Sequence, residues 1–391
     1  MNYSILNTDV QIFIQENLHT DTSRILLSKS PFAGVSSKEL AEQIDSKKRC
    51  EKKLPLWFST PGIYYPPKIS IEQASSELTA KFKASLVKGK TLLDLTGGFG
   101  VDSFYFEKAG MQVLHSEINF ELSDIARHNA SILKAANISF YQGSGLDLIN
   151  SGKYFDSIFI DPSRRVNTQK VFMLKDCEHD IPQNLDKLLS SCSRLIIKTS
   201  PLLDLQAGLL ELTNVSQIYI LSIKNDCKEL IWVLDSDSKT PEPEIICHTF
   251  NEEQQEYRFK TSDERSFTLT DFSVPQKFLY EPDVALLKAG CFKLISRDFS
   301  LSKLNPNSHL YTSENLNKDF AGRKFMIDEW TDYRTFIKTN KLRKANIISR
   351  NFPLSNPEIK KKHRIKDGGD DFLIFTTGPE GQLLVVQCHK V

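Results

Sequence analysis

The sequence predicts an α/β protein built around a largely parallel sheet, and three observations support this. Between Thr91 and Leu234, short apolar runs of strand length alternate with amphipathic stretches of helical spacing, which indicates a parallel sheet covered by helices on both faces. A glycine-rich turn follows the first apolar run, and the regions on either side of the alternation have different patterns. The 391 residues also exceed what one hydrophobic core usually organises, so we expect several domains.

Five segments are expected along the chain. Residues 1–88 have apolar positions at helical spacing and should form a helical N-terminal region. Residues 89–236 hold the alternating strands and helices. The polar, proline-containing stretch SDSKTPEPE then marks a boundary, and residues 237–276 should form a linker with the short strands EIICHTF, EYRFKT and SFTLTDF. Residues 277–321 and 322–391 complete the chain as an α+β part, which ends in a hairpin of FLIFTT with QLLVVQCHK.

The central segment should contain seven strands. They are TLLDL (91–95), VLHSE (113–117), ISFYQ (138–142), SIFID (157–161), RLIIK (194–198), QIYILSI (217–223) and ELIWVL (229–234). The link between the last two is too short for a parallel crossover, so we expect an antiparallel hairpin there. In the N-terminal region, S-x-x-E at Ser36 and S-x-x-Q at Ser70 predict helix starts, and the second should open a helix that runs to about Val87.

Composition indicates an ordinary cytoplasmic protein. The seven cysteines are scattered without a C-x-x-C pair, which favours neither a disulfide framework nor a zinc site. The histidines form no metalloprotease pattern either, so no metal is expected. The first residues lack a basic segment followed by an apolar run, and no segment reaches the roughly 20 apolar residues of a membrane span.

Charge is unevenly distributed, although the formal net charge is only +1. Residues 323–366 contain thirteen Lys or Arg against four Asp or Glu. Such a segment can bind a phosphate-bearing partner, or it can be a solvated lysine-rich surface.

The turn after the first strand is the strongest functional signal. Asp94, Thr96, Gly97, Gly98 and Gly100 fall within TLLDLTGGFGVDSF, between an apolar strand and a helix. Glycines are needed where the backbone approaches a ligand closely and where φ is positive. The pattern acidic-x-G-x-G-x-G of an S-adenosylmethionine (AdoMet) loop fits, with Thr96 in place of the first glycine. The acidic residue suits a cationic sulfonium ligand.

A dinucleotide is the competing ligand for this turn. Its fingerprint G-x-G-x-x-G requires a glycine where Ser103 stands. A carboxylate at position 94 would also repel a pyrophosphate, so AdoMet is favoured over a dinucleotide or a bare structural turn.

Further candidate residues lie at the ends of the next strands. Glu117 ends the second strand, where Rossmann-like folds place a carboxylate that binds ribose hydroxyls. Ser144 and Asp147 follow the third strand, where an adenine is usually held, and either could contact it or be a plain turn residue. Asp161 and Pro162 follow the fourth strand.

The Asp161-Pro162 pair suggests chemistry on an exocyclic amine. The Asp161 carboxylate and the Pro162 carbonyl could accept both amine hydrogens and direct the lone pair toward a methyl donor. Ser163, Arg164 and Arg165 follow and could contact phosphate or a base edge. The alternative is a strand-end turn with solvated arginines.

Together these features resemble the class I AdoMet-dependent methyltransferases, and within them the trimethylguanosine synthase-like RNA methyltransferases. The chain is most similar to a bacterial group, common in Bacteroidetes, that joins a helical region and a methyltransferase core to a ferredoxin-like segment and a THUMP-like domain. The stretches that carry this resemblance are IEQASSELTAKFKA (71–84), DPSRR (161–165), IKTSPLLDL (197–205) and NDCKEL (225–230).

The resemblance implies a Rossmann-like seven-stranded sheet of order 3-2-1-4-5-7-6, a ferredoxin-like segment at 277–321 and a basic THUMP-like domain at 322–391. THUMP-type domains are associated with RNA binding, which implies an RNA partner. Amino-methyltransferases commonly follow the Asp-Pro pair with proline and a stacking aromatic, whereas Ser163 and Arg164 stand here. We therefore expect an AdoMet-dependent enzyme that methylates a base amino group in RNA. The alternatives are a catalytically inactive RNA-binding protein, or a methyltransferase for DNA or a small molecule.

Overall fold

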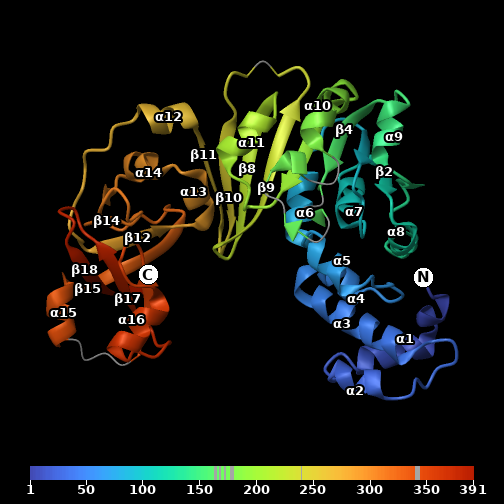
Figure 1. Ribbon diagram of the computed structural model, residues 1–391, viewed down its shortest axis with the longest axis horizontal. Helices are drawn as coiled ribbons and strands as arrows, with labels where there is room; N and C mark the ends of the chain where they lie inside the picture. The colour runs from blue at the N-terminus through green and yellow to red at the C-terminus, as the bar shows by residue number, and fades with distance from the viewer. Residues whose placement is uncertain (163–164, 167–168, 171–172, 177–179, 239, 340–343) are drawn as a thin grey trace. The chain divides into compact units, whose positions relative to one another are not determined.

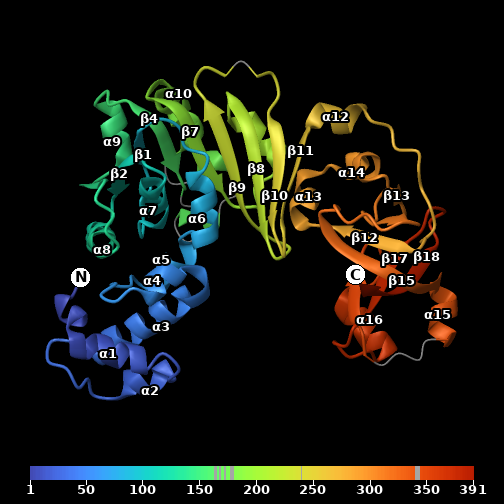
Figure 2. The ribbon, with the colours of Figure 1, turned by 180° about the vertical axis from the view of Figure 1, so that it is seen from behind.

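The computed structural model describes the whole chain except residues 163–164, 167–168, 171–172, 177–179, 239 and 340–343. The described chain forms two compact units, which Figures 1 and 2 show from opposite sides. Unit 1 comprises Met1–Ser216 with Trp232–Thr240, and unit 2 comprises Gln217–Ile231 with Pro241–Val391. None of the described helices is long and apolar enough to cross a membrane.

Unit 1 begins with a series of helices, of which those before residue 74 lie together at one end of its α/β part (Figure 1). They are η1 (Tyr3–Leu6), α1 (Thr8–Glu16), α2 (Thr22–Leu27), α3 (Ser37–Lys53), α4 (Pro55–Ser59), α5 (Lys68–Gln73) and α6 (Glu77–Ala84). The capping box at Ser36 is confirmed. The predicted helix from Ser70 to Val87 is wrong, because α5 ends at Gln73 and Ser76 caps a new helix.

The strands and helices of the central region alternate as predicted. They are β1 (Thr91–Asp94), α7 (Val101–Lys108), β2 (Gln112–Glu117), α8 (Phe120–Ile132), β3 (Ile138–Gln142), α9 (Gly145–Asn150), β4 (Phe155–Ile160), β5 (Arg165–Val166), β6 (Gln169–Lys170), η2 (Leu174–Asp176), α10 (Ile181–Ser190), β7 (Cys192–Thr199), α11 (Leu205–Glu211), β8 (Val215–Ile223) and β9 (Asp226–Asp235). Strands β5 and β6 form a separate two-stranded hairpin.

The main sheet has the strand order β11-β10-β8-β9-β7-β4-β1-β2-β3. Its seven strands from β3 to β8 reproduce the expected order 3-2-1-4-5-7-6. Only Lys224 and Asn225 separate β8 from β9, both with positive φ, and so short a link requires the predicted antiparallel hairpin.

Strands β10 (Glu244–Phe250) and β11 (Gln254–Lys260) extend the sheet beyond β8, to which β10 is parallel. The third run expected to be a strand, SFTLTDF, is not one. The short helix α12 (Thr261–Ser266) takes its first residue, and the remainder has no strand of its own.

The rest of unit 2 contains a second sheet, of order β13-β14-β12-β15-β18-β17-β16. Its elements are β12 (Phe278–Pro282), α13 (Val284–Ala289), α14 (Phe292–Phe299), β13 (Ser302–Lys303), β14 (Tyr311–Ser313), β15 (Gly322–Asp332), α15 (Tyr333–Thr339), β16 (Asn346–Ser349), α16 (Asn356–His363), β17 (Asp371–Thr377) and β18 (Leu383–Lys390). The predicted terminal hairpin is confirmed as antiparallel β17 and β18.

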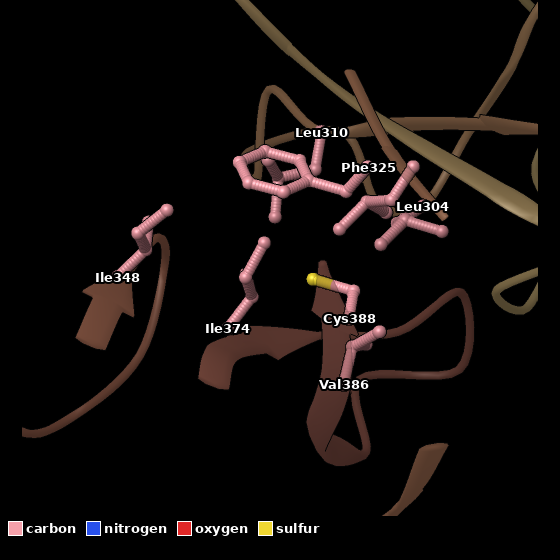
Figure 3. Packing of buried hydrophobic residues seen from close by; sticks show 8 residues of the cluster. Leu304, Leu310, Phe325, Ile348, Ile374, Val386 and Cys388 are labelled. Carbon is pink, nitrogen blue, oxygen red and sulfur yellow. The ribbon is translucent and has the colours of Figure 1, made fainter. Parts of the chain in front are cut away.

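One hydrophobic cluster joins the two halves of this sheet. Figure 3 shows Ile348, Ile374 and Cys388 facing Leu310 and Phe325. The cluster therefore draws side chains from both sides of β15. A buried carboxylate adds a second link, because Glu281 of β12 pairs with Arg323 and also accepts from Arg350 Nε at 2.9 Å.

We expect Glu281→Gln to lower the free energy of unfolding of unit 2 by about 2 kcal/mol. The substitution leaves both arginines without their counter-charge, and their partial exposure to solvent limits the cost. Urea unfolding measures the change, and Glu329→Gln on the exposed part of β15 is the matched control. Equal stability of the two variants would contradict a stabilising role for the ion pairs of Glu281 with Arg323 and Arg350.

Candidate active site

The glycine-rich turn between β1 and α7 lies at the carboxyl edge of the sheet. Gly98 and Gly100 have φ of +54° and +84°, where other residues are strained. A Cβ on Gly97 would lie 2.2 Å from Cε1 of His115. The Gly97 amide donates to the carbonyl of Ser116 at 2.8 Å, so the neighbouring strand end holds the turn in place.

Asp94 is the last residue of β1, just before this turn, and it is 1% exposed. Its Oδ2 accepts a hydrogen bond of 2.5 Å from Ser103 Oγ, which lies 3.1 Å from Nδ1 of His115. Its Oδ1 accepts from the amide of Thr96 at 3.3 Å. Burial raises the pKa of Asp94 from 3.8 to about 7, and burial lowers the pKa of His115 to about 3.

Glu117 is held at the end of β2 by backbone amides. Its Oε2 accepts from Gly98 at 2.9 Å, and its Oε1 accepts from Asn119 at 2.8 Å. A carboxylate has about four acceptor positions, so these bonds leave capacity for a ligand's hydroxyl groups. The structure therefore brings Glu117 and the glycine turn together, as the sequence predicts.

Ser144 and Asp147 begin the helix after β3. The Ser144 side chain caps α9 and accepts from Leu146 at 3.3 Å, whereas Asp147 is exposed in the first turn. Their proposed contact with an adenine stays a prediction. Gly145 was not predicted as a site residue. A Cβ at this position would lie 2.8 Å from Leu95 Cγ, so a glycine is needed for this close approach.

Asp161 stands directly beside the glycine turn. Its amide donates to Oγ1 of Thr96 at 2.7 Å, so the residue that replaces a glycine in the turn joins the ends of β1 and β4. The buried Pro162 follows. The predicted substrate contacts Ser163 and Arg164 lie outside the described residues, and Arg165 is placed only as backbone in β5.

Sequence reasoning missed two lysines at this site. Lys198, near the end of β7, places its ammonium 2.7 Å from Oδ2 of Asp161. Lys83 of α6 is completely buried and pairs with Asp102 of α7 at 2.8 Å. The available signal was a lysine closing the apolar run RLIIK at a strand's carboxyl end.

Burial raises the pKa of Asp161, and the charges of Lys198 and Lys83 oppose this shift. Asp94, Glu117 and Asp161 are thus each hydrogen-bonded to the glycine-rich turn, at Thr96 or at Gly98. These three acidic residues fit a cationic ligand that carries ribose hydroxyls, and AdoMet is such a ligand. The seven-strand order, the glycine turn and these carboxylates define a class I AdoMet-dependent methyltransferase fold.

Comparison with known proteins agrees with this class. A crystal structure described as a "putative methyltransferase from Porphyromonas gingivalis W83" is 30% identical and covers 99% of this chain and 98% of its own, with a TM-score of 0.87. The chain belongs to the family of that protein. Residues 278–320 match a ferredoxin-like domain model, and residues 322–390 match a THUMP domain-like model.

Other solved structures overlap with a smaller part of the chain. The Pyrococcus abyssi tRNA (uracil-54, C5)-methyltransferase in complex with S-adenosyl-L-homocysteine is 19% identical, covering 44% of this chain and 40% of its own at a TM-score of 0.32. A SAM-dependent methyltransferase from Agrobacterium tumefaciens is 16% identical, covering 41% and 61% at a TM-score of 0.31. No curated protein matches the sequence.

Asp94 predicts a pH dependence of stability. Its carboxyl binds a proton more tightly in the folded chain, with a pKa of about 7 against 3.8, so ionisation disfavours the fold. Relative to wild type, Asp94→Asn should therefore become more stable as the pH rises between these values. Urea unfolding at about pH 5 and about pH 8 measures this difference. Asp186→Asn, at an exposed position, is the matched control, and a change with pH for Asp94→Asn no larger than that of the control would contradict the assignment.

Gly97→Ala should weaken the binding of S-adenosylhomocysteine by at least about tenfold, because the new Cβ collides with His115 and displaces the turn. Calorimetric titration measures the affinity. The double variant Gly97→Ala, His115→Ala lacks the colliding ring and should recover part of the lost affinity. Binding by the single variant as tight as wild type would show that the ligand does not depend on this turn.

Proposed function

We propose that this chain transfers the methyl group of AdoMet to RNA. The observation that carries the proposal is the hydrogen bond of 2.7 Å between the Asp161 amide and Thr96 Oγ1. This hydrogen bond joins the turn that suits the methyl donor to the residue whose carboxylate suits the acceptor. Positioning of this kind is the main source of rate in a direct transfer.

The donor would be held by the β1–α7 turn and by Glu117. A Cβ on Gly98 would meet nothing closer than 3.8 Å, so this residue would admit the donor close to the backbone, and Glu117 would accept its ribose hydroxyls. The buried carboxyl of Asp94 holds the turn through the amide of Thr96. AdoMet supplies an electrophilic methyl group on a positively charged sulfur.

RNA as the substrate is supported by unit 2. Its last residues match a THUMP domain-like model, and residues 323–366 carry the basic excess noted in the sequence. Clustered Lys and Arg bind phosphate backbones by neutralising their charge. On this proposal the substrate is contacted by the residues that follow Asp161 and Pro162 in the sequence, which are Ser163, Arg164 and Arg165. The protein would act in the cytoplasm.

The sequence predicts a base amino group as the acceptor, held by Asp161 and the Pro162 carbonyl. An inactive RNA-binding protein, or a methyltransferase for DNA or a small molecule, is the alternative. The contact between Lys198 and Asp161 bears directly on the acceptor, because it occupies one carboxylate oxygen with a donor.

Labelled AdoMet incubated with total RNA from a strain lacking the gene should transfer label to RNA. Asp161→Ala should reduce the rate by roughly 100-fold or more, since it removes the carboxylate at the acceptor position. Asp186→Ala on the exposed face of α10 is the control and should keep wild-type activity. Label in DNA, protein or a metabolite but never in RNA would refute the proposal, and no bound AdoMet would favour the inactive alternative.

A further inference from the structure

A lysine ammonium group contacts the carboxylate on the acceptor side, that of Asp161. The Lys198 ammonium lies 2.7 Å from Asp161 Oδ2, and both side chains are partly exposed, at 17% and 28%. Lys83 is fully buried and pairs with Asp102, and the charges of these two residues act on Asp161 in opposite directions. The group next to the reacting atoms is therefore a carboxylate in direct contact with one ammonium group, that of Lys198.

This arrangement is poorly suited to an amine acceptor. When an amine nitrogen attacks a methyl group it acquires positive charge, which a nearby ammonium group disfavours. The amine also needs hydrogen-bond acceptors, whereas Lys198 can only donate. One oxygen of Asp161 is already engaged by that donor.

A hydroxyl acceptor has the opposite requirements. Its oxygen becomes a good nucleophile as it loses its proton, and negative charge develops on it. An ammonium group stabilises that charge, and a carboxylate can accept the proton. Burial raises the pKa of Asp161, which makes its carboxylate a stronger base than a solvated one.

We infer that the acceptor is a ribose 2′-hydroxyl of RNA, with Asp161 as the base and Lys198 as the cation that contacts the reacting oxygen. This inference rests on the proposed function and specifies its substrate atom. The 2′-hydroxyl is the free hydroxyl of an internal nucleotide and distinguishes RNA from DNA. Lys83 is a positioning residue, because it has no exposed atoms and acts through Asp102 and Asp161.

The step balances with a sulfonium donor as co-reactant. The hydroxyl O–H bond breaks and its proton passes to the Asp161 carboxylate, a lone pair of the oxygen forms the bond to the methyl carbon, and the pair of the carbon–sulfur bond stays on sulfur. The Lys198 ammonium keeps its protons throughout and holds Asp161 through Oδ2.

Alkaline hydrolysis distinguishes the two acceptors. Total RNA from a strain lacking the gene is labelled by the wild-type full chain and then hydrolysed with alkali, which requires a free 2′-hydroxyl at each cleaved bond. A methylated 2′ position resists cleavage, so the label should appear in dinucleotides. Label in mononucleotides means that a base was methylated, which overturns the inference and leaves the proposed function standing. Transfer to no RNA overturns both.

Variants of Lys198 test its role separately. Lys198→Gln should lower the transfer rate by roughly 100-fold or more and leave the affinity for S-adenosylhomocysteine within about threefold of wild type, about 0.6 kcal/mol. Lys198→Arg keeps the charge and should retain more activity. Lys187→Gln, an exposed lysine on the preceding helix, is the matched control. Full activity of Lys198→Gln with unchanged product would overturn the role of this lysine.

Discussion

The hydrogen bond between the Asp161 amide and Thr96 Oγ1 is the interaction on which the site depends. Parallel strands bring their carboxyl ends to one edge of a sheet, but the residues that follow those ends are free to diverge. Here a threonine in a glycine-rich turn fastens the end of β4 to the end of β1. Asp161 is thereby placed beside the turn to which Glu117 and Asp94 are also hydrogen-bonded.

The charges at this edge balance one another. Unpaired buried charges are costly, so each needs a partner or hydrogen bonds. Lys83 meets this requirement through Asp102 and Ser75, and Asp94 through Ser103. Because Lys83 lies on α6 and Asp102 on the first turn of α7, the N-terminal helices are coupled to the helix that begins at the glycine turn.

Much of the fold could be predicted from the sequence because buried parallel strands read as continuous apolar runs. All seven core strands and the terminal hairpin were found in this way, whereas the order of the strands was implied by the resemblance to class I methyltransferases. The break between α5 and α6 was missed, although Ser76 is a local N-cap that accepts from the amide of Thr79 at 3.2 Å. SFTLTDF alternates like a strand, yet it forms only an isolated bridge between Phe272 and Lys303.

The site was predicted where local sequence determines geometry and missed where distant segments meet. Glycines in a turn and a carboxylate at a strand end follow from chain position alone. Lys83 reads as a solvated helical lysine, and its burial depends on α7 packing over it. Lys198 lies 37 residues from Asp161 in sequence, so nothing local reveals that the two form an ion pair.

A crystal structure of the chain with S-adenosylhomocysteine tests the central claim most directly. The account predicts density along the β1–α7 turn, with the ligand's ribose hydroxyls on Glu117 and its sulfur facing Asp161. A turn without bound ligand at saturating concentration, or one blocked by the side chain of Thr96 or Phe99, would contradict the assignment of this edge as the methyl-transfer site.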